Sequence, residues 1–246
     1  MKTKANLKAA PLIREMLKLK NKPQAEFYQR FFRTEPGGYG AGDLFLGLRV
    51  PICRKLASRY RQMPRSEVEK LLLHKYHEVR FVGLVILSFQ AMRCKDFEEQ
   101  EKIALFFLRN KSAANNWDLI DNTVPHILGP WLWNQDKSLH KLPSILAKLS
   151  KSKNLWDRRM AILATFYSLR RNQTKPTLKI AHVLLHDKHD LIHKATGWLL
   201  REVGKRNLPE LKHFLSCYSR EMPRTMLRYA IEKFPAEERK TYLTKV

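Results

Sequence analysis

The segment ANNWDLIDNT (114–123) places a tryptophan and two carboxylates within five positions of a strongly basic chain. Trp117 and Asp121 are four residues apart, so they share one face if the segment is helical. Asp118 lies three residues before Asp121, where a carboxylate can stabilise the start of a helix. A carboxylate that faces a polyanion weakens binding, so it suits a catalyst better than a binding module. Trp117 and Asp121 are therefore candidate catalytic residues, with core packing as the alternative for Trp117.

The composition indicates a polyanionic partner. The chain has 246 residues, and 47 Lys and Arg against 23 Asp and Glu give it a formal net charge of +24. A surplus of this size destabilises the compact state by self-repulsion, and binding to nucleic acid relieves that repulsion. An anionic membrane surface and a merely solubilising surface are the alternatives. Nucleic acid is the partner that we expect.

Other features of the sequence narrow the class of protein. Hydrophobic residues make up 44% of the chain, enough for a sizeable core. Cys53, Cys94 and Cys217 form no CxxC pair, so neither a zinc ribbon nor a disulfide framework is predicted. The first residues lack the apolar core of a signal peptide, and the longest apolar stretch is about half of a membrane span. We expect a cytoplasmic protein, nucleoid-associated in a bacterium, without a membrane partner.

The elements that would position the candidate residues are predicted to be helices. Apolar residues recur at three- and four-residue spacing in segments such as VRFVGLVILSFQAM (79–92) and HKATGWLLREVGKR (193–206). Alternating strand patterns are scarce, and proline and glycine fall mainly between the apolar segments. The sequence therefore predicts an all-α protein with short connections between helices.

A charged residue opens the apolar face of several predicted helices at a repeating interval. Arg159, Lys194 and Arg228 are separated by 35 and 34 residues, and Arg80 stands 79 residues before Arg159. Asp121 falls near the middle of that longer gap. Periods of this size, with two helices per unit, are typical of HEAT-like repeats that stack into a curved α-solenoid. We therefore predict a single HEAT-like domain over the whole chain, with these five residues near one line of its concave face.

Three local segments complete this organisation. A basic N-terminal helix is predicted over about residues 1–20. The glycine-rich stretch TEPGGYGAGD (34–43) lacks the Lys-Ser/Thr of a phosphate-binding loop, so we expect a mobile connection. The four histidines between His182 and His193 have the spacing of metal ligands, but the HExxH glutamate is missing and the run is expected to link two helices. No metal site is predicted.

Four separated motifs carry a family resemblance. They are DLFLGLRVPICRKLASRY (43–60), NNWDLIDNTVPHILG (115–129), NLWDRRMAILATF (154–166) and HKATGWLLREVGKRN (193–207). In order and spacing they resemble the AlkD-like DNA alkylation-repair glycosylases over roughly residues 20 to 230. The resemblance implies a HEAT-like fold that cups duplex DNA on a basic concave face. It also implies a monomeric, monofunctional enzyme of base excision repair that hydrolyses the N-glycosidic bond of N3- or N7-alkylated purines without metal or cofactor.

The resemblance also implies roles for single residues. The family's catalytic aspartate corresponds to Asp121, its active-site tryptophans to Trp117 and Trp198, and its DNA-contacting arginine to Arg159. Tyr28 matches an aromatic residue of the family's second helix and is expected to contact DNA.

Further basic residues are expected to bind DNA. Arg158 would hold phosphates together with Arg159. Arg80, Lys194 and Arg228 would extend the basic line. One departure from the family concerns Asn116, which stands where many members have a second tryptophan.

Two other functions remain open from the sequence. A non-catalytic HEAT-like module that binds DNA or structured RNA by shape would need the basic line but not Asp121. A protein-binding scaffold is the usual role of an α-solenoid and explains the repeats but not the charge. Since fold alone does not decide function, the choice depends on the set formed by Trp117, Asp121, Arg159 and Trp198.

Overall fold

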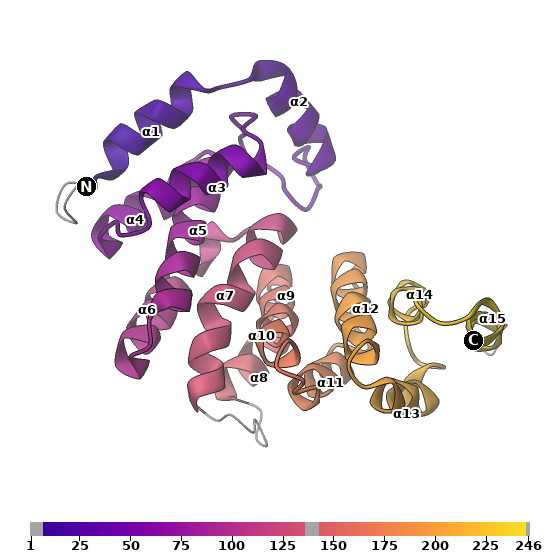
Figure 1. The fold of residues 1–246 in the computed structure, drawn as a ribbon. Coiled ribbons are helices and arrows are strands. Elements are labelled where there is room, and N and C mark those ends of the chain that lie inside the picture. Colours follow the sequence, from indigo (N-terminus) through magenta and orange to yellow (C-terminus); the bar gives the residue numbers. More distant parts are fainter. Residues whose placement is uncertain (1–6, 136–142, 245–246) are drawn as a thin grey trace. The chain divides into compact units, whose positions relative to one another are not determined.

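The computed structural model describes residues 7–135 and 143–244 (Figure 1). Over these ranges every regular element is a helix, and the one strand-like feature is an isolated bridge between Leu44 and Tyr76. The predicted all-α fold class is therefore confirmed. Among the described helices, none is both long and apolar enough to cross a membrane.

The chain divides into two compact units, Met1–Ile127 and Leu128–Val246. The boundary falls inside one long helix, α7 (Trp117–Gln135), which contributes its first turns to the first unit. The single repeat domain expected from the sequence stays a prediction. Each unit is described by itself below.

The first unit is built around a buried central helix, α5 (His77–Arg93), which packs against helices on either side of it in the sequence. Every residue of α5 from His77 to Ser88 is buried, which explains why this segment is apolar almost all round. The other elements that begin in this unit are α1 (Ala9–Lys18), α2 (Lys22–Phe31), α3 (Val50–Arg59), α4 (Arg65–Leu72), α6 (Phe97–Arg109) and the 3-10 turn η2 (Lys111–Ala113).

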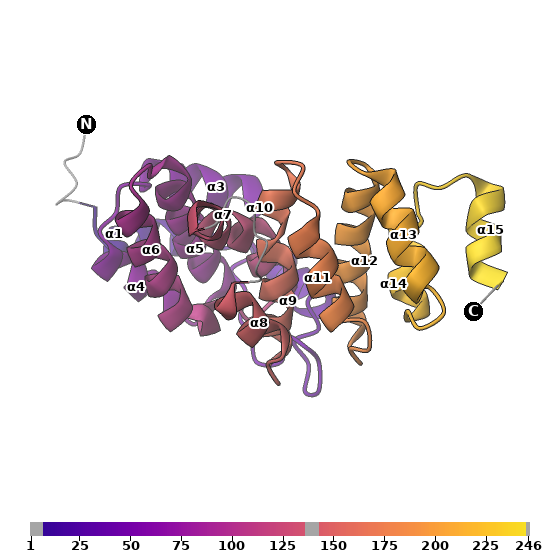
Figure 2. The same cartoon turned by 90° about the horizontal axis from the view of Figure 1, so that it is seen from below.

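The second unit repeats a pattern of paired helices, as HEAT-like repeats do (Figure 2). Its elements are α8 (Ser144–Ser150), α9 (Leu155–Ala164), α10 (Phe166–Leu169), α11 (Lys175–Val183), α12 (Asp190–Gly204), α13 (Leu208–Tyr218), α14 (Arg224–Ala230) and α15 (Ala236–Thr244). Helix α12 is the centre of this unit and packs against α9, α11, α13 and α14. A Cβ at Gly197 would lie 2.4 Å from the carbonyl oxygen of Met226, so glycine permits the close approach of α12 and α14.

The repeat register seen in the sequence recurs in the helices. Asp121, Arg159, Lys194 and Arg228 are each the fifth residue of their helices, which are α7, α9, α12 and α14. Arg80 is the fourth residue of α5. The shared position agrees with helices that descend from one repeated unit, although the burial of these residues differs, as shown below.

The predicted N-terminal helix is shorter than expected. It is α1, Ala9–Lys18, and the segment before it lies partly outside the described residues. The glycine-rich stretch 34–43 forms consecutive turns, with hydrogen bonds from Gly40 N to Arg33 O and from Gly42 N to Thr34 O. Positive φ angles of 82° and 81° at Gly37 and Gly42 explain the glycines there. Its mobility stays a prediction.

Candidate active site

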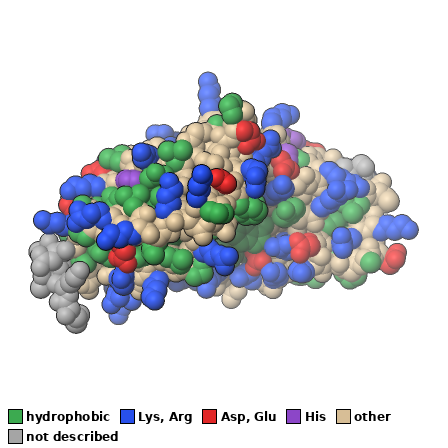
Figure 3. Space-filling model, turned by 90° about the horizontal axis from the view of Figure 1, so that it is seen from above, with side chains coloured by type: hydrophobic (Ala, Val, Ile, Leu, Met, Phe, Trp, Pro, Cys, Tyr) green, Lys and Arg blue, Asp and Glu red, His purple; other side chains and the backbone are tan. Residues whose placement is uncertain are grey.

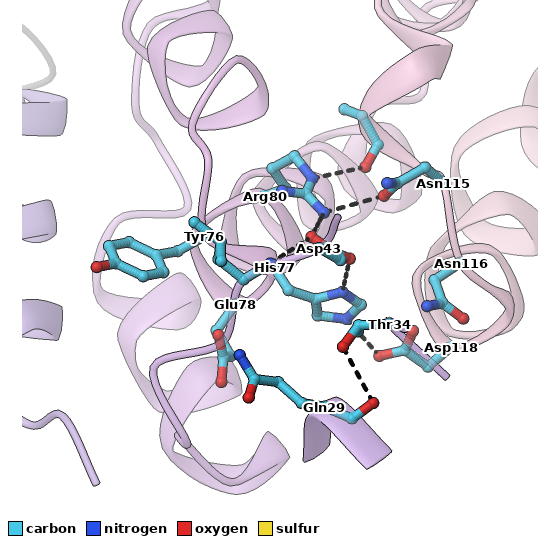
Figure 4. Close-up of polar contacts among 12 residues, drawn as sticks. Gln29, Thr34, Asp43, Tyr76, His77, Glu78, Arg80, Asn115, Asn116 and Asp118 are labelled. Atoms are coloured by element: carbon cyan, nitrogen blue, oxygen red, sulfur yellow. Dashed lines mark hydrogen bonds and ion pairs between the residues drawn. The ribbon is translucent and has the colours of Figure 1, made fainter. Parts of the chain in front are cut away.

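A buried chain of charged side chains lies at the start of α5. His77 is almost fully buried and stands between two carboxylates, with Nδ1 2.8 Å from Asp43 Oδ2 and Nε2 2.8 Å from Asp118 Oδ2 (Figure 4). Both ring nitrogens need a proton to make these bonds, so the imidazole is cationic. Burial by itself lowers the pKa of His77, but Asp118 and Asp43 together raise it to about 9. Burial tends to raise the pKa of Asp43, but the hydrogen bond to His77 lowers it. The net pKa of Asp43 is below its ordinary value.

Arg80 completes this buried chain of charged side chains. It is 7% exposed and donates from Nη2 to Asp43 Oδ1 at 2.7 Å and to Asn115 Oδ1 at 2.9 Å (Figure 4). Its Nε donates to the carbonyl oxygen of Ala113, and Nη1 donates to the carbonyl oxygens at positions 74 and 75. These bonds use all five N–H groups of the guanidinium. Arg80 is therefore held by partners within the first unit, and its role in DNA binding stays a prediction.

The segment DLFLGL (43–48) is held against α5 by a third carboxylate, that of Glu78. Glu78 accepts hydrogen bonds from the backbone N–H groups of Leu46 and Gly47 at 2.8 Å and of Leu48 at 3.1 Å. Gly47 has a φ of 83°, and a Cβ there would lie 2.1 Å from the carbonyl oxygen of Asn21. The first motif of the sequence is thus a tightly bound connection that fixes the neighbouring side chains in place.

Aromatic side chains gather beside these charges. The ring of Phe45 is stacked on His77 with centroids 4.5 Å apart, and Phe32 is stacked on Phe45 at 5.1 Å. Tyr28 lies edge-on to Phe45 at 5.8 Å, and the indole of Trp117 lies 5.4 Å from Phe32. Burial first, and then the charge of Glu78, raise the pKa of Tyr28, so its phenol is neutral at physiological pH.

An aromatic pocket of about 310 Å³ opens among these rings. It is bounded by α2, by the connection 43–48 and by the first turns of α3, α5 and α7. Tyr28, Phe31, Phe45 and Trp117 supply aromatic walls, while Asp118 and Asn122 supply polar atoms. We use the term aromatic pocket for this cavity below.

The first turns of α7 carry the candidate catalytic face. Trp117, Asp118 and Asn122 line the aromatic pocket, and Asp121 is half-buried on the same helix. At 100° per residue, Asp121 lies at an angular position between Trp117 and Asp118. The structure therefore places Trp117 and Asp121 on one helix face, as predicted. Tyr28 of α2 lines the same pocket.

The glycine-rich stretch contributes to the same site. Tyr39 receives a hydrogen bond on its hydroxyl oxygen from Trp117 Nε1 at 3.4 Å and donates to the carbonyl oxygen of Phe31 at 3.3 Å. Asp43, at the end of the stretch, is the buried partner of His77. The turns 34–43 thus help to orient Trp117.

The second unit carries the remaining predicted site residues. Arg159 on α9 is 5% exposed and donates from Nη1 to the carbonyl oxygen of Leu191 on α12. Arg158 is half-buried and forms an ion pair with Asp187, 2.5 Å from Nε to Oδ2. The expected clamp on DNA phosphates is therefore made of side chains that already have partners within the unit, and its role in DNA binding stays a prediction.

Three other predicted residues of the second unit are more accessible. Lys194 is half-buried and lies 2.7 Å from Asp190 in an ion pair one helical turn apart. Arg228 on α14 is exposed. Trp198 on α12 is half-buried, with its indole 5.6 Å from the ring of Phe166. Figure 3 shows that Lys and Arg side chains greatly outnumber Asp and Glu on the face that it presents.

Comparisons with known proteins place this chain in a family. The sequence profile of the family described as DNA alkylation repair enzyme matches residues 12–234, most of the chain. The chain belongs to the DNA alkylation repair enzyme family. Family membership implies that its substrate class is DNA. No curated protein matches the sequence.

A solved structure has a similar fold. It is described as a predicted DNA alkylation repair enzyme from Enterococcus faecalis and is 18% identical in sequence. The likeness covers 88% of this chain and 97% of that one, with a TM-score of 0.68. At this identity the likeness establishes the shared fold.

Several residues of this site were not predicted from the sequence. Asp43, His77 and Glu78 were assigned no role, and Asp118 was expected only to stabilise the start of a helix. The available signal was the pair His77–Glu78 directly before a long apolar run, since charged residues at the edge of a buried segment need partners. The partner Asp43 is 34 residues away, and no local pattern connects the two.

The histidine run and the cysteines form no metal site among the described residues, where no cluster of three potential ligands is present. His186 lies 3.3 Å from Glu221, while the ring of His193 lies against the carbonyl oxygen of Asp187. Burial raises the pKa of the Cys53 thiol to about 12, so this cysteine of the pocket wall is protonated.

Proposed function

We propose that this chain is a DNA glycosylase that hydrolyses the N-glycosidic bond of N3- or N7-alkylated purines in duplex DNA, the first step of base excision repair. The observation that carries the proposal is the first part of α7. There Trp117 and the half-buried Asp121 share a face beside an aromatic pocket, in a chain with a net charge of +24. Family membership supports DNA as the substrate.

The proposed hydrolysis needs only one catalytic carboxylate. As the bond between C1′ and the purine nitrogen breaks, its electron pair moves onto the base and cancels the charge of the alkylated ring. Positive charge develops on the sugar in an oxocarbenium-like transition state. The Asp121 carboxylate stabilises that charge, and it accepts a proton from the water whose oxygen bonds to C1′. An alkylated purine is already cationic and departs readily, so no second catalytic acid is needed.

The aromatic residues act on the same charge. The indole face of Trp117 attracts a cationic sugar or base with an energy of about 0.5 to 2 kcal/mol. We assign Trp198 of the second unit the same kind of role, as the family resemblance implies. Arg158, Arg159, Lys194 and Arg228 are proposed to contact phosphates, which position the duplex without reading its sequence.

Incubation with duplex DNA that contains N7-methylguanine tests the proposal. We expect the wild-type protein to release free N7-methylguanine and to leave an abasic site, while undamaged guanine stays in place. If the protein binds the duplex but releases no base, a module that reads DNA shape without catalysis becomes the better account.

A further inference from the structure

A second cavity lies in the first unit, at the end of α5 that is remote from the candidate active site. It has a volume of about 620 Å³ and is bounded by the connection between α3 and α4, the last turns of α5 and the first part of α6. Both α4 and α6 pack against α5 (Figure 1). His77 and Gln90 are 13 residues apart on α5, which is about 20 Å of helix, so this cavity is separate from the aromatic pocket.

Three arginines line this cavity, which we call the arginine cavity: Arg61, Arg65 and Arg93. Arg65 forms an ion pair with Glu99, 2.5 Å from Nη1 to Oε1, whereas Arg61 and Arg93 form no ion pair with any described residue. Three positive charges and the one carboxylate in the lining leave a formal charge of +2. A phosphomonoester carries about −1.5 to −2 charges near pH 7, so it matches this lining better than a single carboxylate does.

The rest of the wall is mainly apolar. Met63 and Ile103 are buried and Phe89 is half-buried, and all three line the cavity. The volume of about 620 Å³ is near the middle of the range for small-molecule sites, about 300 to 1,000 Å³. A bare inorganic anion leaves most of this space and the apolar wall unused. The cavity therefore suits a phosphate that is carried on a flat, partly apolar body.

Hydrogen bonds hold both connections that bound the arginine cavity. Gln90 Nε2 donates to the carbonyl oxygens of Arg61 and Met63, at 3.2 and 2.8 Å. On the other side, Gln100 Nε2 donates to the carbonyl oxygen of Cys94 at 2.6 Å. These bonds fix the backbone on both sides of α5, so the cavity is formed before a ligand arrives. A preformed site loses less conformational entropy when it binds.

We propose that the arginine cavity binds a nucleoside monophosphate. The guanidinium groups of Arg61, Arg65 and Arg93 hold the phosphate in charge-assisted hydrogen bonds, and the base packs against Phe89 and its apolar neighbours. A free nucleotide and the 5′-phosphorylated end of a DNA strand both carry this group. The site goes beyond the proposed glycosylase, because none of its residues lines the aromatic pocket or is a proposed catalytic or phosphate contact.

The cysteines of the chain supply a reporter and its control. Cys94 lines the arginine cavity and is half-buried, while Cys217 is exposed on α13. Iodoacetamide is uncharged, so its approach to either thiol does not depend on the protein's charge. With deoxyguanosine 5′-monophosphate at about ten times its Kd, alkylation of Cys94 is expected to be at least about fivefold slower, because the site is then about 90% occupied. Cys217 should react at its unliganded rate, as measured by mass spectrometry of the two peptides.

Two matched variants locate the bound phosphate. Arg93→Met removes an exposed arginine of the cavity, and calorimetry is expected to show about tenfold weaker binding of deoxyguanosine 5′-monophosphate. Arg220→Met removes an exposed arginine of the second unit and the same charge, and it should leave this affinity unchanged. Both variants should keep the urea midpoint of wild type, since both side chains are exposed.

Comparison ligands separate the two sources of the phosphate. A 5′-phosphorylated trinucleotide that protects Cys94 at lower concentration than the free nucleotide would identify a strand end as the ligand, and the reverse order would identify the free nucleotide. Deoxyguanosine and a trinucleotide without the 5′-phosphate should give no protection.

Four results would overturn the proposal. The first is a Cys94 rate that neither phosphorylated ligand changes. The second is equal slowing of Cys94 and Cys217, or equal weakening in Arg93→Met and Arg220→Met, which would mean general attraction of anions to a basic chain. The third is protection by inorganic phosphate at the same concentration as by the nucleotide, which would leave the base without a role. The fourth is protection by a glutamate-rich peptide and by neither nucleotide ligand, which would assign the cavity to an acidic protein partner.

Discussion

His77 on α5 and Asp118 on α7 form a buried ion pair, with 2.8 Å between Nε2 and Oδ2. Asp118 is next to Trp117 and three residues before Asp121, so this pair fixes the helix turn that carries the candidate catalytic face. The second carboxylate on His77, Asp43, ties the same turn to the connection 43–48. The candidate catalytic turn is therefore oriented by a buried chain of charged groups.

The stability of the fold is expected to fall at alkaline pH. The folded-state pKa of His77 is about 9, above its ordinary value of 6.5. The stabilisation from the protonated ring is therefore complete below about pH 6.5 and is lost as the pH rises through about 9. Asp43 has a lowered pKa, so its contribution is lost in the opposite direction, on acidification. The free energy of unfolding, measured by urea denaturation from about pH 6.5 to above pH 9, tests this expectation.

Variants of two histidines test whether His77 causes this alkaline loss of stability. His77→Gln is expected to be less stable than wild type near neutral pH and to lose the alkaline decline. His213 is exposed on α13, and His213→Gln should retain the wild-type profile. An alkaline decline that persists in His77→Gln would mean that another group is responsible.

Arg80→Met is expected to destabilise the fold by about 3 to 5 kcal/mol, because it leaves Asp43 with one cation fewer in a buried site. The unfolding free energy from urea titration measures this loss. Arg228→Met removes an exposed arginine and should change the unfolding free energy by less than about 0.5 kcal/mol. An Arg80→Met protein of wild-type stability that had lost DNA binding would contradict this structural role and would identify Arg80 as a DNA contact.

The helical fold could be predicted because its signal is local. Apolar spacing within each segment, and proline between segments, are enough to place helices such as α5 and α12. The face shared by Trp117 and Asp121 follows from a separation of four residues in the same way. The common fifth position of Asp121 and Arg159 in their helices likewise follows from a repeat that is visible in the sequence.

The buried charges could not be predicted because their partners are distant in the sequence. Arg80 and Arg228 occupy similar places in their repeats, yet one is buried and the other is exposed. Arg80 is buried because it pairs with Asp43, which lies 37 residues earlier in the chain. A pattern of basic residues alone does not reveal such a partner. The aromatic pocket could not be predicted for the same reason, because its walls come from elements that are distant in the sequence: α2 and the first turns of α3, α5 and α7.

DNA binding is expected to depend steeply on salt. If six or more phosphates are neutralised, affinity should fall by orders of magnitude between about 50 and 200 mM salt. Arg228→Ala should reduce the slope of log affinity against log salt by about 0.9, since one phosphate contact is lost. Arg228→Lys keeps the charge and should keep the slope. An affinity that is indifferent to salt would contradict a basic DNA-binding surface.

Asp121→Asn is expected to separate catalysis from binding. The substitution is nearly isosteric and removes one negative charge, so the variant should bind alkylated duplex as tightly as wild type or slightly more tightly. Glu26→Gln is the charge control, because Glu26 is exposed on α2 and does not line the pocket. Asp118→Asn is unsuitable as a control, because Asp118 is the buried partner of His77.

The single-turnover rate of N7-methylguanine release from duplex DNA, compared between wild type and Asp121→Asn, tests the central claim most directly. Removal of one well-placed electrostatic group costs about 10² to 10³ in rate, and we expect a loss of this size with undiminished DNA affinity. Glu26→Gln should release base at the wild-type rate. Release by Asp121→Asn at the wild-type rate would contradict the assignment of Asp121 as the catalytic carboxylate.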